Sequence, residues 1–316
     1  MKNFSQDSVL VYKGRGVKMD TLLIKKDKFT YATSIDKPVQ YLFMTPSTFR
    51  GKERKLFLLV CVPDEKAELV GDLTNRWDVT GSKFYQQYHE LDLVTEAAMK
   101  TPDADKTMNG KLLDFIAQHP DYEACTTVLD QLDGLESINK ALGLLSENVR
   151  NGRMKAYYEP IVEYAKKRAE AEEKAKKAQA SGVEAFDFKL KDIKGNDFQL
   201  SSLRGKYVIL DFWGSWCIWC IKGMPKMKEY YSKYAGKFEI VGVDCNDTEA
   251  KWKAAVEKHQ LPWIHVYNTK DSGILEKYAI QGFPTKIVVG PDGKIVKTIV
   301  GEDPAFYTLL DELFSK

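Results

Sequence analysis

The second half of the sequence alternates between strand-like and helix-like segments, and this alternation limits the fold more than any other feature. Apolar runs such as YVILDFW (207–213) and FEIVGVD (238–244) are separated by segments with helical spacing, such as TEAKWKAAVEKHQ (248–260). Strands that alternate with helices are typical of an α/β sheet with helices on both faces. TKIVVG (285–290) and KIVKTIVG (294–301), joined by the turn PDG, predict an antiparallel hairpin that closes one edge.

The first half of the chain has a different pattern. Short β-prone runs divided by polar or turn residues lie between Ser8 and Gly81, and they predict a small antiparallel β domain: SVLVYKG, MDTLLI, KFTYAT, PVQYLFM, KLFLLVCV, KAELVG and RWDVTG. Helical spacing follows, and it ends in the charged stretch EYAKKRAEAEEKAKKAQASG, which predicts a solvated helix that stops at Ser181–Gly182. We therefore expect a β-rich domain (1–100), a helical segment with a charged linker helix (101–182) and an α/β domain (183–316).

Composition excludes some classes of partner. A net charge of +2 on 316 residues offers no electrostatic reason to bind nucleic acid or an anionic membrane. No run of about 18 apolar residues is present, and the first ten residues lack the apolar centre of a secretory signal. From the sequence we expect no nucleic-acid partner, no membrane-spanning segment, no cofactor and no metal.

Five cysteines are too few to hold a chain of this length together by disulfides. Three of them lie in apolar surroundings and are expected to be small buried hydrophobic residues: Cys61, Cys125 and Cys245. Cys217 and Cys220 differ, because they are three positions apart in DFWGSWCIWCIKGMP. They could be metal ligands, a structural disulfide, buried core thiols or a redox pair.

The position of Cys217 at the start of a predicted helix favours the redox pair. Unpaired amides and the helix dipole stabilise a thiolate there and lower the pKa of a thiol from about 8.5 to about 3.5–7.5. Residues i and i+3 share a helix face, so Cys220 can close onto Cys217 with little backbone movement. A zinc site with His259 and His265 is disfavoured, because several predicted elements separate the histidines from the cysteines.

Three neighbours of the pair have predicted roles. Asp211 lies on the strand before the helix and is the acidic candidate that could take a proton from Cys220, since burial among aromatic residues raises a carboxyl pKa. Trp216 and Trp219 flank thiols that we expect to be exposed, so these rings should form a surface that contacts substrate.

Residues 183–316 resemble the thioredoxin superfamily, and more closely its TlpA/ResA-like branch of thiol-disulfide oxidoreductases. The resemblance rests on five segments: Asp211–Cys220, Met224–Pro225, Val243–Asp244, Gly282–Thr285 and Pro291–Gly293. It implies that Pro284 is cis and packs against the disulfide, that Phe283 offers its backbone to a substrate peptide, and that Thr285 adjoins that site. The segments VTGSKFYQQYHEL and FIAQHPDY also resemble the β-rich domain of unknown function that precedes such modules. That resemblance implies an exported protein of the periplasm, with a possible membrane tether.

Two departures from the family pattern bear on mechanism. Many TlpA-like proteins carry Glu three residues after the second cysteine, whereas this chain has Gly223, so the proton role is assigned to Asp211. Ile218 and Trp219, between the cysteines, provide no donor that would stabilise a thiolate, which favours a reductant.

The sequence therefore predicts a thiol-disulfide oxidoreductase that reduces protein or peptide disulfides and is itself reduced by an unidentified thiol donor. A redox-inactive peptide-binding module, or an oxidase or isomerase that uses the same cysteines, is the alternative.

Overall fold

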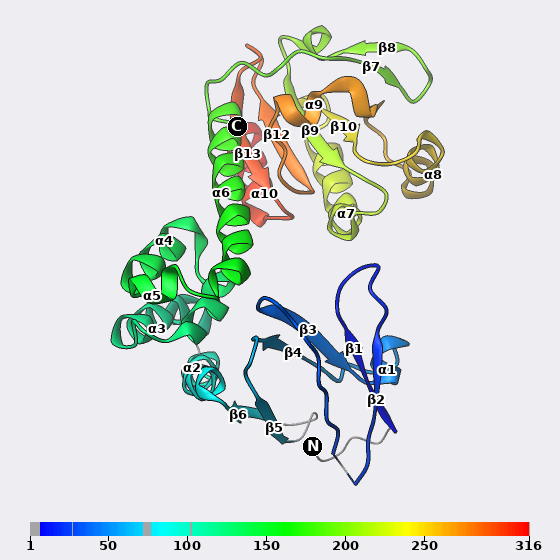
Figure 1. The fold of residues 1–316 in the computed structure, drawn as a ribbon. Helices are drawn as coiled ribbons and strands as arrows, with labels where there is room; N and C mark the ends of the chain where they lie inside the picture. Colours follow the sequence, from blue (N-terminus) through cyan, green and yellow to red (C-terminus); the bar gives the residue numbers. More distant parts are fainter. Residues whose placement is uncertain (1–6, 27, 72–76, 102, 316) are drawn as a thin grey trace. The chain divides into compact units, whose positions relative to one another are not determined.

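The computed structural model describes residues 7–26, 28–71, 77–101 and 103–315. Chain contacts divide the protein into two compact units, residues 1–169 and 170–316 (Figure 1). Each unit has its own hydrophobic core.

The first unit begins with an antiparallel sheet in the order β2-β1-β3-β4. Its strands are β1 (Ser8–Tyr12), β2 (Asp20–Leu23), β3 (Val39–Met44) and β4 (Leu56–Cys61), with the single turn α1 (Pro46–Phe49) between the last two. A separate pair, β5 (Ala67–Gly71) and β6 (Trp77–Gly81), follows. The predicted small antiparallel β region is confirmed.

One predicted strand, KFTYAT, does not form. Residues 29–35 pair with no strand in the described part of the first unit. Phe29 and Tyr31 nevertheless pack against the core, and the Tyr31 hydroxyl donates a hydrogen bond to Asp20 at 2.7 Å. The alternation that resembled a strand is therefore that of aromatic side chains packed along a loop.

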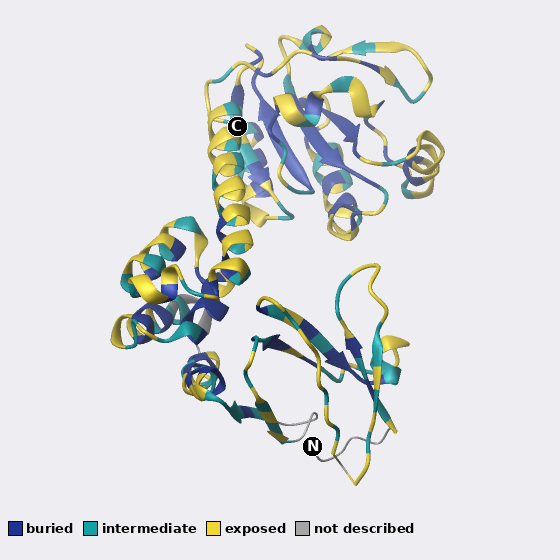
Figure 2. Cartoon of the chain, in the orientation of Figure 1, coloured by how far each residue is buried: buried dark blue, intermediate teal, exposed yellow. Residues whose placement is uncertain are grey.

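Helices complete the first unit and share its core. They are α2 (Lys83–Met99), α3 (Ala104–Gln118), the 3-10 helix η1 (Glu123–Gln131), α4 (Gly134–Leu144), α5 (Glu147–Arg150) and the start of α6 (Lys155–Ala178). The helix α6 is largely exposed toward its end (Figure 2), as predicted for the charged linker.

A seven-stranded mixed sheet forms the centre of the second unit, in the order β13-β12-β9-β10-β11-β7-β8. The strands are β7 (Lys189–Asp192), β8 (Asp197–Gln199), β9 (Tyr207–Trp213), β10 (Phe238–Asp244), β11 (Ile264–Tyr267), β12 (Thr285–Val289) and β13 (Ile295–Val300). The neighbours β9, β10 and β11 are parallel, and an antiparallel hairpin lies at each edge.

Helices lie on both faces of this sheet. They are η2 (Leu200–Leu203), α7 (Ile218–Lys233), α8 (Glu249–His259), η3 (Lys270–Ser272), α9 (Ile274–Lys277) and α10 (Pro304–Phe314). The central strand β9 alternates between two cores: Ile209 and Trp213 pack with α7, α8 and α10, whereas Leu210 and Phe212 pack on the side of α9. The predicted α/β fold of this part of the chain is confirmed.

The predicted boundaries near residues 100 and 182 concern which segments fold independently, and they remain a prediction. None of the described helices is both long enough and apolar enough to cross a membrane.

Candidate active site

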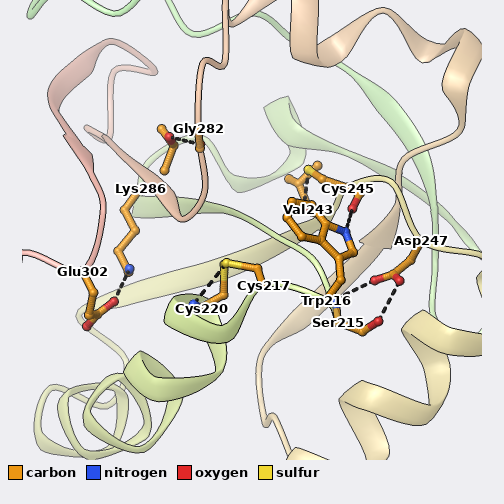
Figure 3. The surroundings of a disulfide bond; sticks show 11 residues. Ser215, Trp216, Cys217, Cys220, Val243, Cys245, Asp247, Gly282, Lys286 and Glu302 are labelled. Carbon is orange, nitrogen blue, oxygen red and sulfur yellow. Dashed lines mark hydrogen bonds and ion pairs between the residues drawn. A yellow bond between two sulfur atoms is a disulfide. The ribbon is translucent and has the colours of Figure 1, made fainter. Parts of the chain in front are cut away.

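The two cysteines lie where β9 ends and α7 begins (Figure 3). Cys217 is the N-cap residue of α7, and Cys220 is in the first turn of the helix. They form a disulfide, with their Cα atoms 5.3 Å apart. The backbone N–H of Cys220 donates to the Cys217 sulfur at 3.2 Å. The helix N-terminus thus directs one of its free N–H groups at the sulfur of Cys217, which is the arrangement that stabilises a thiolate.

Polar contacts fix the loop that precedes the disulfide. The backbone N–H and the hydroxyl of Ser215 donate to the Asp247 carboxylate at 2.6 and 2.7 Å. The indole N–H of Trp216 donates to the carbonyl of Cys245 at 3.0 Å. A Cβ atom on Gly214 would lie 2.5 Å from the Trp216 indole nitrogen, so this approach requires glycine. Sequence reasoning missed Asp247, because it lies on a different loop.

Aromatic side chains surround the cysteines on the solvent side. Trp216 is 53% exposed and Trp219 is 58% exposed. The Trp216 ring meets the edge of Phe283 with centroids 5.4 Å apart, and the Lys222 ammonium lies 4.5 Å from the centre of the Trp219 ring. The structure therefore brings Phe283 next to the disulfide loop and leaves both tryptophans accessible to a partner.

The predicted Phe283–Pro284 turn has a cis peptide bond. Pro284 and Thr285 are buried, and the Thr285 hydroxyl donates to the carbonyl of Gly282 at 2.7 Å. Thr285 therefore serves to hold the turn closed, and Phe283 is the part of this segment that reaches the aromatic surface.

One expectation about the cysteines is wrong. Their thiols were expected to be exposed, but in this oxidised form Cys217 is only 5% exposed and Cys220 only 4%. Both pack in the core between α7 and the sheet. The exposed part of the site is the aromatic rim, which is formed by Trp216, Trp219 and Phe283.

Asp211 is buried on the sheet face below α7, the face that also carries Ile209 and Trp213. Burial raises its pKa to about 6, while the Lys286 ammonium lowers it and the Glu302 carboxylate raises it. Its Oδ1 atom has no hydrogen-bond partner among the described residues. A buried carboxyl with a pKa near neutrality is suited to exchange a proton with a thiol.

From the sequence, Asp211 is the only acidic candidate near the two cysteines. The structure places a second acid, Glu302, against α7. The Glu302 carboxylate lies over the backbone of Gly223, where a Cβ atom would be 2.3 Å from its Oε2. Glu302 also forms an ion pair with Lys286 at 2.9 Å (Figure 3). Sequence reasoning missed Glu302, because β13 and its following turn are remote from α7 in the chain.

No group of three or more His, Cys, Asp or Glu side chains in the described ranges could hold a metal ion. His265 is buried, and its pKa is lowered to about 4 by burial, so it is neutral. It packs against the rings of Trp213 and Trp263.

The three remaining cysteines are unpaired. Cys125 and Cys245 are buried, as expected, whereas Cys61 is half-buried. Burial raises the pKa of Cys61 to about 11 and that of Cys125 to about 12, and it raises the pKa of Cys245 well above the ordinary value. These thiols are poor nucleophiles at neutral pH.

Comparison with known proteins matches the second unit. The sequence profile of the AhpC/TSA family matches residues 181–298. The thiol-disulfide oxidoreductase ResA of a Bacillus cereus strain is 39% identical over 122 residues, which are 38% of this chain and 70% of that protein. ResA of Bacillus subtilis is 32% identical over 127 residues, 40% of this chain and 70% of that protein. The solved thioredoxin domain of a Bacteroides vulgatus thiol-disulfide oxidoreductase is 36% identical, with a TM-score of 0.40 over 42% of this chain and 98% of that domain.

Proposed function

Since the chain belongs to the thioredoxin-like thiol-disulfide oxidoreductases of the ResA family, we propose that it reduces disulfide bonds in other proteins through Cys217 and Cys220. The observation that carries this proposal is the position of the pair: the sulfur of Cys217 caps α7, and Cys220 lies one helical turn further in. The N-terminal end of a helix is where an attacking thiolate is most stable.

The cycle starts from the dithiol form. The Cys217 thiolate attacks one sulfur of the partner disulfide, a mixed disulfide forms, and the other partner sulfur leaves as a thiolate that takes up a proton. The Cys220 thiol then gives its proton to Asp211 and attacks Cys217, which releases the second partner thiol and leaves the Cys217–Cys220 disulfide. An external thiol donor, unidentified here, returns the pair to the dithiol by the same exchange in reverse.

The rim of the site indicates the kind of partner. Trp216, Ile218, Trp219 and Phe283 present an apolar and aromatic surface around the disulfide. Such a surface suits an extended peptide with apolar side chains beside its cysteine, and Phe283 precedes the buried Pro284, so that its backbone can pair with the peptide.

The reducing direction rests on what surrounds Cys217. A strong oxidant needs a stabilised thiolate, and the residues between the cysteines are Ile218 and Trp219, which add no donor to the helix N-terminus. An oxidase or isomerase that uses the same cysteines is the second candidate. A redox titration with glutathione separates them: a potential near that of thioredoxin, about −270 mV, supports the reductase, and one near about −120 mV supports the oxidase.

We further propose an extracytoplasmic location, the periplasm in a Gram-negative cell. The three cysteines outside the site have pKa values raised by burial, so they resist unwanted pairing in an oxidising compartment. Cell fractionation of the full-length gene product tests this location.

The function is tested by turbidity when insulin is reduced by dithiothreitol, with and without the protein. Acceleration that disappears in Cys217→Ser supports the reductase. No acceleration, with a peptide still bound, would instead support the redox-inactive binding module.

A further inference from the structure

A group of three charged side chains lies on the α7 side of the sheet. Asp211 on β9 and Lys286 on β12 are opposite each other in the antiparallel ladder, so both side chains project from the same face. Lys286 is only 2% exposed, and Glu302, just after β13, is 20% exposed. A buried ammonium between two carboxylates can pair with either of them.

The Lys286 ammonium pairs with Glu302. The two are 2.9 Å apart, and the Phe306 ring lies 5.4 Å from the ammonium. Within the described residues, no hydrogen bond reaches Oδ1 of Asp211. In the described part of the chain, Oδ1 of Asp211 is therefore left unpaired. Lys286 acts on Asp211 through its charge, which lowers the pKa of that carboxyl, while its ion pair is with Glu302.

Two contacts hold Glu302 in this place. The Tyr307 hydroxyl donates to Oε1 of Glu302 at 2.7 Å. On the other side, the carboxylate occupies the space above Gly223, and a Cβ atom there would lie 2.3–2.7 Å from its three terminal atoms. Gly223 is thus a condition for the position of Glu302, since any other residue at 223 would displace the carboxylate.

We propose that Glu302 is a positioning residue for the resolving step: it holds the Lys286 ammonium away from Asp211, so that the Asp211 carboxylate is free to take the proton of Cys220. This inference rests on the proposed reductase function and assigns a new part to it. If Lys286 turned to Asp211 instead, the carboxylate would be stabilised in its charged form and would be a weaker base.

Several groups face Asp211 and bear on its titration. The side chains on the same sheet face or on the helices packed against it are those of Lys286, Glu302, Tyr307, Cys217, Cys220, Asp244 and His265. His265 is neutral, and the Tyr307 pKa is raised by burial, so that neither changes charge near neutral pH. Burial raises the pKa of Asp244 to about 8, and none of the proposed substitutions changes this residue.

The test uses Glu302→Gln in the full chain, because glutamine keeps the volume and can still accept the Tyr307 hydrogen bond. Release of a preformed mixed disulfide is followed by stopped-flow tryptophan fluorescence. We expect release at pH 7 to slow on the order of tenfold, with the first attack unchanged. The acid limb of the release rate, near pH 6 in the wild type, should move to lower pH, because the freed ammonium keeps Asp211 ionised. Glu257→Gln, an exposed change on α8, is the matched control.

Two further variants separate positioning from a loss of folding. When Lys286→Met is added to Glu302→Gln, the rate of release should be restored, because the ammonium that turned to Asp211 is gone. If Glu302→Gln slowed release only by damaging the structure, the second substitution would slow release further. Gly223→Ala should reproduce the slow release by displacing the carboxylate, which can swing to solvent. A carboxyl ¹³C titration of Asp211 requires no turnover. Because loss of the Glu302 charge lowers the Asp211 pKa by itself, the proposal is supported, even if the reductase function fails, when Lys286→Met raises the Asp211 pKa more in Glu302→Gln than in the wild type. Unchanged release with an unchanged Asp211 pKa, or a double variant slower than the single one, overturns it.

Discussion

The indole N–H of Trp216 donates to the carbonyl of Cys245 at 3.0 Å, so the ring beside Cys217 is tied to the loop that follows β10. The same ring meets the edge of Phe283. One hydrogen bond thus connects the exposed aromatic side chains of the site to the end of the central strand β10.

Trp216→Phe keeps a ring at this position and removes the donor. A single hydrogen bond contributes about 0.5–1.5 kcal/mol, so we expect KM for a protein disulfide substrate to rise by a factor on the order of 3–10, with kcat little changed. Steady-state reduction of a labelled disulfide peptide measures both constants. Trp219→Phe, whose indole nitrogen forms no hydrogen bond within the described chain, should raise KM less. Equal effects of the two changes would mean that ring area, not the tie to Cys245, sets affinity.

Replacement of each cysteine should give a different product. Cys217→Ser removes the attacking thiolate and should abolish insulin reduction. Cys220→Ser leaves the attack intact but removes resolution, so a mixed disulfide with the partner should accumulate and be visible on a non-reducing gel. Trapping through Cys220 in the Cys217→Ser variant would reverse the assigned roles.

Asp211→Asn should slow the release of the mixed disulfide by a factor on the order of 10–100 at pH 7, because the proton acceptor is lost while solvent substitutes in part. In the wild type, release should fall as pH drops through about 6, where Asp211 becomes protonated and cannot accept. The defect of the variant should shrink above pH of about 8.5, where Cys220 ionises unaided. A wild-type release rate that is flat from pH 5 to 8 would remove Asp211 from the mechanism.

Asp211→Asn should also change the free energy of unfolding, and the raised pKa of Asp211 determines the direction of that change. The pKa of Asp211 is raised in the folded protein, so its charged form destabilises the fold at pH above about 6, and this cost vanishes as pH falls below about 3.8. Asn carries no charge, so Asp211→Asn should increase the free energy of unfolding at pH 7 by on the order of 2–3 kcal/mol and change it little at pH 4. Urea unfolding of the oxidised protein at both pH values gives the comparison.

Residues 183–316 should fold and reduce insulin without the first unit, because every part of the active site lies after residue 182. This fragment should still unfold at a lower temperature than residues 170–316. The side chain of Gln179 donates to the carbonyls of Tyr278 and Ala279 at 2.7 and 3.2 Å, and the shorter fragment lacks these bonds. Calorimetry of both fragments measures the difference. If only the longer fragment were active, the end of α6 would be part of the redox domain.

The order of the main elements in the second unit could be predicted, since the strands β9, β10 and β12 are apolar runs and the helices α7, α8 and α10 each have a capping residue at their start. Cys217 and Thr248 show this well: each caps the helix that follows. Burial of Asp211 could also be predicted, because it lies in a continuous apolar strand.

Contacts between remote segments could not be predicted. The bond from Ser215 to Asp247 and the position of Glu302 over Gly223 depend on how loops from different strands meet. The pattern of apolar residues within one segment carries no information about contacts with a remote segment. The low exposure of the thiols escaped for the same reason, because it depends on how the start of α7 packs against the sheet.

The crowding between residue 223 and the Glu302 carboxylate also restricts the paths by which such a protein can diverge. A side chain at 223 and a carboxylate at 302 exclude each other in this arrangement, so the two positions should vary together among related sequences. A lineage that holds an acid at 302 in this conformation needs glycine at 223. Among related sequences, glycine at 223 without an acid at 302 should therefore be more frequent than acids at both positions.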